Sequence, residues 1–365
     1  MLSEVTKKGN VKVKITKINT RAVKTSLNEP LRIAFGLVTH SVSVIVEVET
    51  DEGLVGIGEG SPSIIVTGET IEGTLECLRV FERDLIGVDP TDLEKVYWIV
   101  DRAAFHAPCG KTAIDMACHD LLGKKCGMPV YKLLGGYDNC IKTDITLGID
   151  IPEVMAEKAK KYVNQGFDII KVKVGTVLED DIARVKAIRE AVGPDVLIRV
   201  DANQAWTPKG AVRAIGRISE YGIELVEQPV KFHDIKGLSY VTKYCGVPVM
   251  ADESCFTPNE VLRVIEERAA DLVNIKLMKC GGIRQALCIN SICEAAGVEC
   301  MLGCMIEETN IAITAAASLG AAVKNITRAD LDAVFGMTHT IYKGGVDYSE
   351  KILKLPDTPG FGFIA

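Results

Sequence analysis

Phe167-Asp-Ile-Ile-Lys-Val-Lys-Val-Gly175 is a short, mainly apolar stretch that ends in a lysine and a glycine. Apolar runs of the same kind lead to four further ionisable residues, at intervals of 24 to 28 residues. Such an interval is about the length of one strand, one helix and two loops. The spacing therefore predicts a repeated βα unit whose strands each carry one charged side chain to the same end. These side chains belong to Lys173, Asp201, Glu227, Asp252 and Lys276.

The same repeat can be followed in both directions along the chain. Its β-branched runs alternate with segments rich in Ala, Glu, Lys and Arg, which is typical of strands covered by helices on a parallel sheet. Strands are expected to begin near residues 141, 169, 197, 223, 247, 272, 299 and 326. Eight such units predict an α/β fold of the (β/α)8 type, a TIM-like barrel with its active site at the carboxyl ends of the strands.

At 365 residues the chain is longer than one barrel of about 250 residues requires. The patterns at Val11–Ile18, Val42–Glu49 and Leu54–Gly58 alternate as antiparallel strands do, and helical patterns follow around residues 71–85, 93–102 and 111–125. We therefore expect an N-terminal α+β capping domain over residues 1–135 and a catalytic barrel over 136–343. The tail, residues 344–365, is expected to return toward the capping domain.

Composition excludes several classes of protein. The formal net charge is −7 and the chain has no basic stripe, so nucleic acid is not an expected partner. No apolar run approaches the roughly 20 residues that cross a membrane, and no signal peptide is evident. The 12 cysteines show no paired CxxC spacing, which indicates free thiols in a reducing compartment. A cytoplasmic enzyme is the expectation.

Three carboxylates follow consecutive predicted strands, the third, fourth and fifth of the barrel. Asp201, Glu227 and Asp252 would therefore converge on one arc of the rim. Three hard oxygen ligands without His or Cys suit Mg²⁺ better than zinc, and they leave positions for water and substrate. The sequence predicts one divalent ion held by these residues.

Two lysines come from strands on opposite sides of the predicted ring. Lys173 ends the second strand and Lys276 ends the sixth, so their ammonium groups should face each other across the pocket. Two bases beside a metal ion can remove a proton from one face of a carbon and return it to the other. Lys171 lies on the same strand face as Lys173, and we expect its charge to disfavour protonation of the catalytic amine.

Taken together, the motifs around these residues resemble the muconate-lactonizing subgroup of the enolase superfamily. The resemblance implies a capping domain over the barrel, Mg²⁺ at the three carboxylates, and acid/base roles for Lys173 and Lys276. It rests on Lys171-Val-Lys173, Asp201-Ala-Asn203, Val226-Glu-Gln-Pro229, Ala251-Asp-Glu-Ser254 and Asn274-Ile-Lys276.

Within that subgroup, Asp330-Leu-Asp332 resembles the Asp-x-Asp pair of the dipeptide epimerases. Residues i and i+2 of a strand point to one side, so both carboxylates could receive the ammonium group of a dipeptide. The segment Gly303-Cys-Met-Ile-Glu307 is also similar, and it implies that Ile306, like Lys171, lies against the substrate. The implied reaction inverts the α-carbon of the second residue of an L-Ala-Xaa dipeptide, in a protein expected to be a homo-oligomer.

The capping-domain loop departs from epimerases that are selective for Ala-Glu. Those enzymes carry an arginine six residues after a proline, and counting from Pro30 gives Gly36. Without a guanidinium, a second carboxylate would lack its bidentate partner. Arg32 could take this role if the loop bends differently, but its neighbours favour an uncharged or hydrophobic second residue. These neighbours are Leu31, Ile33, Phe35, Leu37 and Val38.

Two other functions are compatible with the same barrel. In a lyase of the superfamily, an o-succinylbenzoate synthase or a muconate-type cycloisomerase, the two lysines would serve a β-elimination or its reverse. Such substrates have no ammonium group, so the Asp-x-Asp pair argues against them. A barrel that only binds a metabolite would need no opposed bases.

Overall fold

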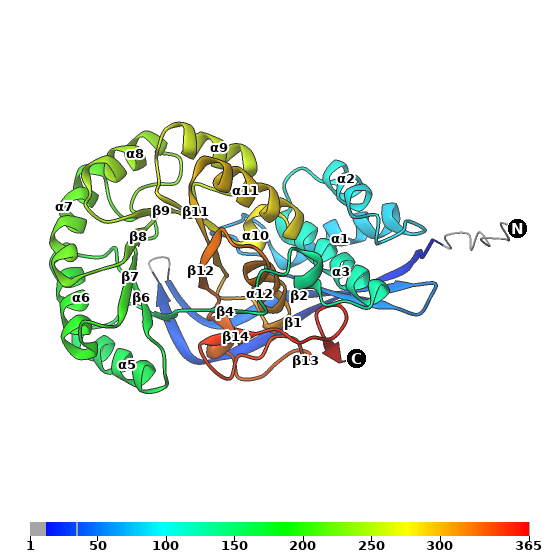
Figure 1. The fold of residues 1–365 in the computed structure, drawn as a ribbon, viewed down its shortest axis with the longest axis horizontal. Coiled ribbons are helices and arrows are strands. Elements are labelled where there is room, and N and C mark those ends of the chain that lie inside the picture. Colours follow the sequence, from blue (N-terminus) through cyan, green and yellow to red (C-terminus); the bar gives the residue numbers. More distant parts are fainter. Residues whose placement is uncertain (1–11, 34–35, 365) are drawn as a thin grey trace, which may run out of the picture.

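The computed structural model describes residues 12–33 and 36–364. It contains an eight-stranded parallel sheet, with helices on its outer face, and a separate antiparallel sheet (Figure 1). The predicted fold class, a TIM-like barrel with an N-terminal α+β domain, is confirmed. Within these residues, no helix is both long enough and apolar enough to span a bilayer.

The barrel strands lie side by side in chain order, from β5 to β12. Their bounds are β5 Ile145–Leu147, β6 Ile169–Lys173, β7 Leu197–Asp201, β8 Leu225–Glu227, β9 Val249–Ala251, β10 Leu272–Ile275, β11 Glu299–Gly303 and β12 Ile326–Asp330. The helical segments between or after them are α5 Pro152–Asn164, α6 Leu178–Val192, α7 Pro208–Ile218, η1 Ser219–Tyr221, α8 Ile235–Tyr244, α9 Pro258–Glu266, α10 Leu277–Cys280, α11 Ile283–Ala296, α12 Asn310–Ala322 and η2 Ala333–Gly336.

The ring closes where the segment before β5 meets β12. Thr143 forms a parallel bridge with Ala329, and the amide of Asp144 donates to the Ala329 carbonyl over 3.4 Å. Inside the ring, β8 to β11 contribute a buried apolar layer, whereas the opposite side holds buried charged residues such as Lys171 and Arg199. This layer of the interior therefore has an apolar side and a charged side.

The first predicted strand, near residue 141, is divided in two. Cys140–Lys142 forms β4, which pairs antiparallel with β14 (Ile352–Lys354) in the tail, and Ile145–Leu147 forms β5 of the barrel. The division has a physical reason, because Thr143 and Asp144 are fully buried polar residues that bond across to β12. The strands predicted near 223 and 247 each begin two residues later than expected.

The N-terminal domain is a three-stranded antiparallel sheet packed on helices. Strand β3 has glycine at every second position, and a Cβ added at Gly58 would lie 1.9 Å from the Ala113 carbonyl oxygen. Glycine is needed there because helix and sheet approach so closely. The elements are β1 Ile15–Ile33, β2 Gly36–Thr50, β3 Val55–Gly60, α1 Ile71–Leu85, α2 Leu93–Ala103, α3 Pro108–Cys126 and α4 Val130–Leu133.

Strands β1 and β2 are much longer than the alternating pattern predicts. They continue as a hairpin to Ile33 and Gly36, with a register shift between Ser26 and Leu31. At this irregularity, Asn28-Glu29-Pro30 interrupts the alternation of apolar and polar residues. The alternation therefore does not predict that the strand continues. Val11, the predicted start of the first strand, and Phe35, predicted in the loop, lie outside the described residues.

The tail contacts both parts of the molecule. Besides β14 it contains β13 (Lys343–Gly344) and β15 (Phe363–Ile364), which pair with each other. The amide of Phe361 donates to Asp120 in α3 over 2.8 Å, and the Val130 amide donates to the Gly360 carbonyl over 3.0 Å.

Candidate active site

A cavity of about 640 Å³ lies where the barrel strands end at their carboxyl side. Its floor includes Lys173 of β6, Lys276 just after β10, and Asp330 of β12. Its outer wall comes from the N-terminal domain, namely residues 27–31 and 36–38 of the long hairpin and residues 63, 65 and 66. The cavity is thus built jointly by the barrel and the N-terminal domain.

Lys173 and Lys276 lie on strands four places apart in the eight-stranded sheet, which puts them on opposite sides of the ring. Both side chains are about nine-tenths buried, with 12% and 11% exposed. Lys173 Nζ donates to Asp201 Oδ2 over 2.6 Å, and Lys276 Nζ donates to Asp252 Oδ2 over 2.9 Å. Each lysine therefore has a carboxylate that holds its ammonium group at the cavity.

The three predicted metal ligands end neighbouring strands, as the sequence predicts. Asp201 is the register partner of Glu227, and Asp252 directly follows β9. All three are buried, and burial together with Asp201 raises the pKa of Glu227 to about 7. This crowding of negative charge, without His or Cys, is the donor set that a hard divalent cation would relieve.

Nearby lysines donate hydrogen bonds to these carboxylates. Burial alone would favour the neutral acid at Asp252, but Lys276 and Lys279 outweigh burial and lower its pKa below the usual range. Burial likewise opposes the charge of Lys276, but Asp252 and Glu227 outweigh it and raise the pKa of the amine. These carboxylates thus stabilise the protonated form of Lys276.

Lys171 has a different environment from the one we expect from sequence. It is buried and donates to Asp330 over 2.6 Å, while its Nζ lies 2.7 Å from Glu227 and 3.2 Å from Asp201. Burial opposes its charge, but these carboxylates outweigh burial and raise the pKa of the amine well above its ordinary value. Lys171 therefore neutralises three carboxylates rather than acting as a free cation beside Lys173, although it also lines the cavity.

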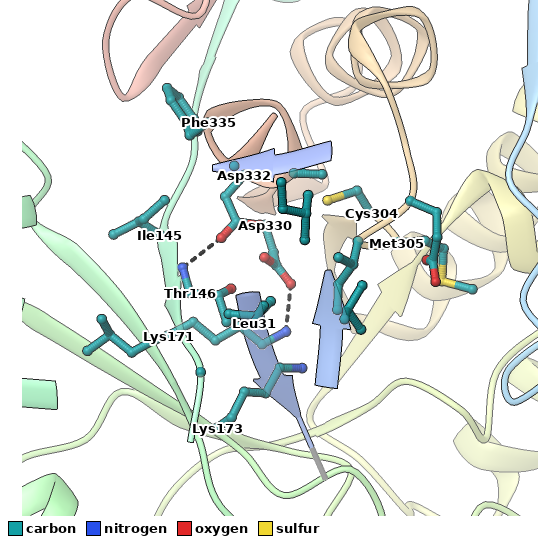
Figure 2. Close-up of a pocket in the computed structure, with 18 of the residues that line it drawn as sticks. Leu31, Ile145, Thr146, Lys171, Lys173, Cys304, Met305, Asp330, Asp332 and Phe335 are labelled. Carbon is teal, nitrogen blue, oxygen red and sulfur yellow. Dashed lines mark hydrogen bonds and ion pairs between the residues drawn. The ribbon is translucent and has the colours of Figure 1, made fainter. Parts of the chain in front are cut away.

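Asp330 and Asp332 project from the end of β12 into the cavity, as Figure 2 shows. Asp330 receives Lys171, and Asp332 Oδ2 accepts from the Thr146 amide over 2.6 Å. Burial and Asp330 raise the pKa of Asp332 to about 6. Burial also opposes the charge of Asp330, but Lys171 and Lys276 outweigh it and lower its pKa to about 2. The pair is an anionic site that suits an ammonium group.

A third carboxylate belongs to this cluster. One oxygen from each of Asp144, Asp330 and Asp332 lies within 4.8 Å of the other two. The oxygens of Asp201, Glu227 and Asp252 do not all lie within this distance of one another, and each of these carboxylates is contacted by at least one lysine. Asp144 is not predicted from the sequence, although its place two residues before Thr146 on the inward face of the barrel could have suggested it.

The substrate contacts predicted for the capping-domain loop and for Ile306 agree only in part with the structure. Ile306 lines the cavity beside Met305 and Glu307. Gly36 also lines it, with a φ of +145° that other residues rarely adopt, so an arginine is disfavoured there. Arg32 is exposed and is absent from the described residues that line the cavity, so the geometry gives no support to a substrate contact for it.

Lys279 is a further residue that spacing alone does not reveal. Its side chain is fully buried, and Nζ donates to both the carboxylate and the carbonyl oxygen of Asp252, and to the Asn274 carbonyl over 3.0 Å. Asn274 in turn donates to Glu227 over 2.7 Å. Both residues fix carboxylates rather than line the cavity. The place of Lys279 in α10, three residues after Lys276, is the signal that could have identified it.

An enolase-like active site, with opposed lysines and acidic residues at the mouth of a capped barrel, is what this geometry defines. Residues 154–364 match the family model described as "Enolase C-terminal domain-like", and residues 15–135 match that of the "Mandelate racemase / muconate lactonizing enzyme, N-terminal domain". The chain belongs to the mandelate racemase / muconate lactonizing enzyme family of the enolase superfamily, which confirms the resemblance found in the sequence.

Within that family the chain is similar to dipeptide epimerases. It is 56% identical to a hydrophobic dipeptide epimerase of Enterococcus faecalis, over 96% of this chain and 99% of that protein. It is 42% identical to an L-Ala-D/L-Glu epimerase of Bacillus subtilis, over 96% and 97% of the two chains. A crystal structure of a dipeptide epimerase from Enterococcus faecalis, "complexed with Mg and dipeptide L-Leu-L-Tyr", superimposes with a TM-score of 0.95 at 55% identity, covering 96% of this chain and all of that one.

Proposed function

We infer that this protein is a dipeptide epimerase, an isomerase that inverts the α-carbon of the second residue of a dipeptide with an uncharged or hydrophobic side chain. The observation that carries the inference is the pair of lysines on opposite sides of one cavity, with the Asp330 and Asp332 carboxylates between them in strand order. The similarity to a hydrophobic dipeptide epimerase over nearly the whole chain supports it.

The lysines perform the proton transfer. One amine removes the α-proton from one face of the carbon, and the ammonium group of the other returns a proton to the opposite face. The lysine that is neutral acts as the base and the lysine that is protonated acts as the acid, and the reverse reaction exchanges the roles. Asp330 and Asp332 fix the dipeptide by its ammonium group, so that the reacting carbon lies between the two amines.

Asp201, Glu227 and Asp252 would hold one Mg²⁺. Their buried oxygens are of the type that Mg²⁺ prefers, and burial, followed by the charge of Asp201, raises the pKa of Glu227. When bound, the ion would stabilise the negative charge that develops on the substrate carboxylate as the α-proton leaves. The crystal structure of the related Enterococcus enzyme, complexed with Mg and a dipeptide, supports this choice of cation.

The preference for an uncharged second residue is supported by the outer wall of the cavity. The hairpin contributes Leu31, Leu37 and Val38 to the lining, and the loop before α1 adds Ile65 and Val66. A cation on this wall would be needed to compensate a second carboxylate. Lys158 and Lys161 of α5 also line the cavity, but both lie close to Glu29 of the hairpin, at 3.4 and 3.8 Å. The first residue need not be alanine, since the cavity also extends to Phe167 and Phe335 beside the ammonium site.

A cytoplasmic location and a homo-oligomeric state complete the proposal. The twelve cysteines are free in the part of the chain that the structure describes, which suits a reducing compartment.

The proposed activity can be tested with a library of L-Ala-Xaa and L-Leu-Xaa dipeptides and Mg²⁺, separating epimers by chiral chromatography. We expect L,D products with apolar Xaa to form fastest. Elimination products, or no inversion with any dipeptide, would contradict the proposal. Faster turnover of L-Ala-L-Glu than of every apolar dipeptide would contradict the specificity alone.

A further inference from the structure

The buried carboxyl group of Asp144 has no role in the chemistry described so far. Asp144 is fully buried next to β5, and its Oδ2 accepts from Arg199 Nη1 over 2.7 Å. Its Oδ1 is also buried, yet it has no hydrogen-bond partner among the described residues. A buried carboxylate oxygen without a donor is costly, so this atom needs an explanation.

The surroundings of Asp144 contain more negative than positive charge. Asp330 at the end of β12 and Asp332 just after it face Asp144 within the 4.8 Å cluster. The facing cations are Lys171 on β6 and Arg199 on β7. Neither cation belongs to this cluster alone, because Lys171 also contacts Asp201 and Glu227, and Arg199 also contacts Glu224. Three carboxylates thus share two cations, and both cations also contact carboxylates outside the cluster.

Such a cluster needs one more positive charge, either a proton or a cation from outside. We propose that Asp144 is the third carboxyl group of the ammonium site, which holds a proton while the site is free and loses it to solvent when the dipeptide ammonium binds. The O–H bond at Oδ1 breaks, the proton passes to buffer, and the ammonium group keeps its own three protons. Asp144 does not touch the substrate and is therefore a positioning residue that acts through Asp330 and Asp332.

The direction of its titration agrees with this geometry. Burial, followed by the charge of Asp330, raises the pKa of Asp144 well above its ordinary value. A cation placed at the cluster would oppose this shift. The inference rests on the proposed dipeptide substrate and deepens it, since it explains how a buried acidic site discriminates an ammonium group from a neutral one.

The first measurement uses the unmodified protein with Mg²⁺ at pH 7. Titration calorimetry in two buffers of different ionisation heat would count protons released on binding L-Leu-L-Tyr and 4-methylpentanoyl-L-tyrosine, the same molecule without its ammonium group. We expect release of about one proton with the dipeptide and none with the analogue. No release with the dipeptide would overturn the inference.

The second measurement uses Asp144→Asn, which keeps the size of the side chain and an acceptor for Arg199. The release of the proton should disappear, and the preference in kcat/KM for the dipeptide over the analogue should fall about tenfold. Because a buried, poorly compensated acid is removed, the melting temperature should not fall. Asp120→Asn is the matched control, because Asp120 is equally buried. Its carboxylate accepts hydrogen bonds from Lys124 Nζ and from the backbone amides of Ile57 and Phe361.

The control variant should lose stability and keep both the proton release and the preference. An Asp144→Asn protein that unfolds, melts earlier or retains full proton release would show a structural role and overturn the inference. If the unmodified protein inverts neither compound, the proposed function itself fails. If it inverts the dipeptide but releases no proton on binding, only the role of Asp144 fails.

Discussion

At the scale of single residues, the position and charge of each lysine of the site depend on the carboxylates around it. Lys171, Lys173 and Lys276 line the cavity, but Lys171, like Lys279, is buried among acidic or carbonyl oxygens that accept its hydrogen bonds. The sequence predicts the two reactive lysines because they end apolar runs at the barrel interval. It does not predict which neighbours neutralise which acid, since the contacts of Lys171 and of Arg199 join residues 159 and 55 positions apart.

Lys173→Ala should abolish inversion while leaving the Mg²⁺ site intact. Loss of a positioned base or acid lowers kcat by about 10²- to 10⁴-fold. Asp201 loses its 2.6 Å partner and is freed, so the affinity for Mg²⁺ should be unchanged or higher. Chiral chromatography and titration calorimetry check the two expectations. Lys142→Ala, at an exposed lysine paired with Asp168, is the control; comparable loss in both variants would refute the assignment.

The ammonium site should become weaker in acid. Burial and Asp330 raise the pKa of Asp332 to about 6, so Asp332 becomes neutral as the pH falls through 6. The KM for a dipeptide should rise below that pH, and the KM of its deaminated analogue should not. A KM that is flat from pH 5 to pH 7 for the dipeptide would contradict this assignment.

The ionised form of Asp332 should also lower the free energy of unfolding near neutral pH. Its folded-state pKa lies above the ordinary value of 3.8, so the folded state binds the proton more tightly. The resulting stabilisation is present in acid and is lost as the pH rises from about 4 to 6. Asp332→Asn should therefore raise the free energy of unfolding at pH 7, by roughly 1 kcal/mol because the side chain is only partly buried. Chemical denaturation at pH 7 measures this, and a less stable variant would be inconsistent with it.

At the scale of secondary-structure elements, the long β1–β2 hairpin joins the N-terminal sheet to the rim of the barrel. Glu29 lies 3.4 Å from Lys158 of α5, and the Ile149 amide donates to the Arg32 carbonyl over 2.8 Å. The barrel strands are predictable because each is a compact apolar run with a fixed interval. The hairpin is not, because it is held by contacts with the barrel rather than by its own alternation.

The hairpin should control the choice of the second residue. Leu37 lines the cavity and is exposed enough to accept a longer side chain, and its backbone, unlike that of Gly36, does not have a positive φ. Leu37→Arg should shift the ratio of kcat/KM between L-Ala-L-Glu and L-Leu-L-Tyr about tenfold toward the glutamate substrate. Leu37→Met is the size control. An unchanged ratio would exclude this wall from specificity.

At the scale of the whole molecule, the N-terminal domain is joined to the barrel by a buried polar contact. Glu59 of β3 accepts from the Thr309 amide, the Thr309 hydroxyl and the Ala312 amide at the start of α12, over 2.6 to 3.0 Å. Ser41 and Ser43 donate to the Glu307 carbonyl. These contacts fix the loop that carries Ile306, so the domain shapes the cavity as well as covering it.

Glu59→Gln should weaken this junction. An amide offers one acceptor atom instead of two, so at least one buried donor loses its partner, at a cost of about 2 kcal/mol. Denaturant unfolding should show the loss. Glu52→Gln, at a partly exposed residue paired with Lys125, should change stability by less than about 0.5 kcal/mol. Equal stability of the two variants would show that the junction carries little of the fold.

The most direct test of the opposed lysines is hydrogen exchange at the α-carbon in D₂O. Proton NMR would follow the exchange with each pure epimer of Leu-Tyr, in the Lys173→Ala and Lys276→Ala variants. Two bases on opposite faces predict that each variant exchanges the α-proton of one epimer only, that the two variants act on different epimers, and that neither inverts the carbon. Inversion by either single variant, or exchange of the same epimer by both, would contradict the two-base mechanism.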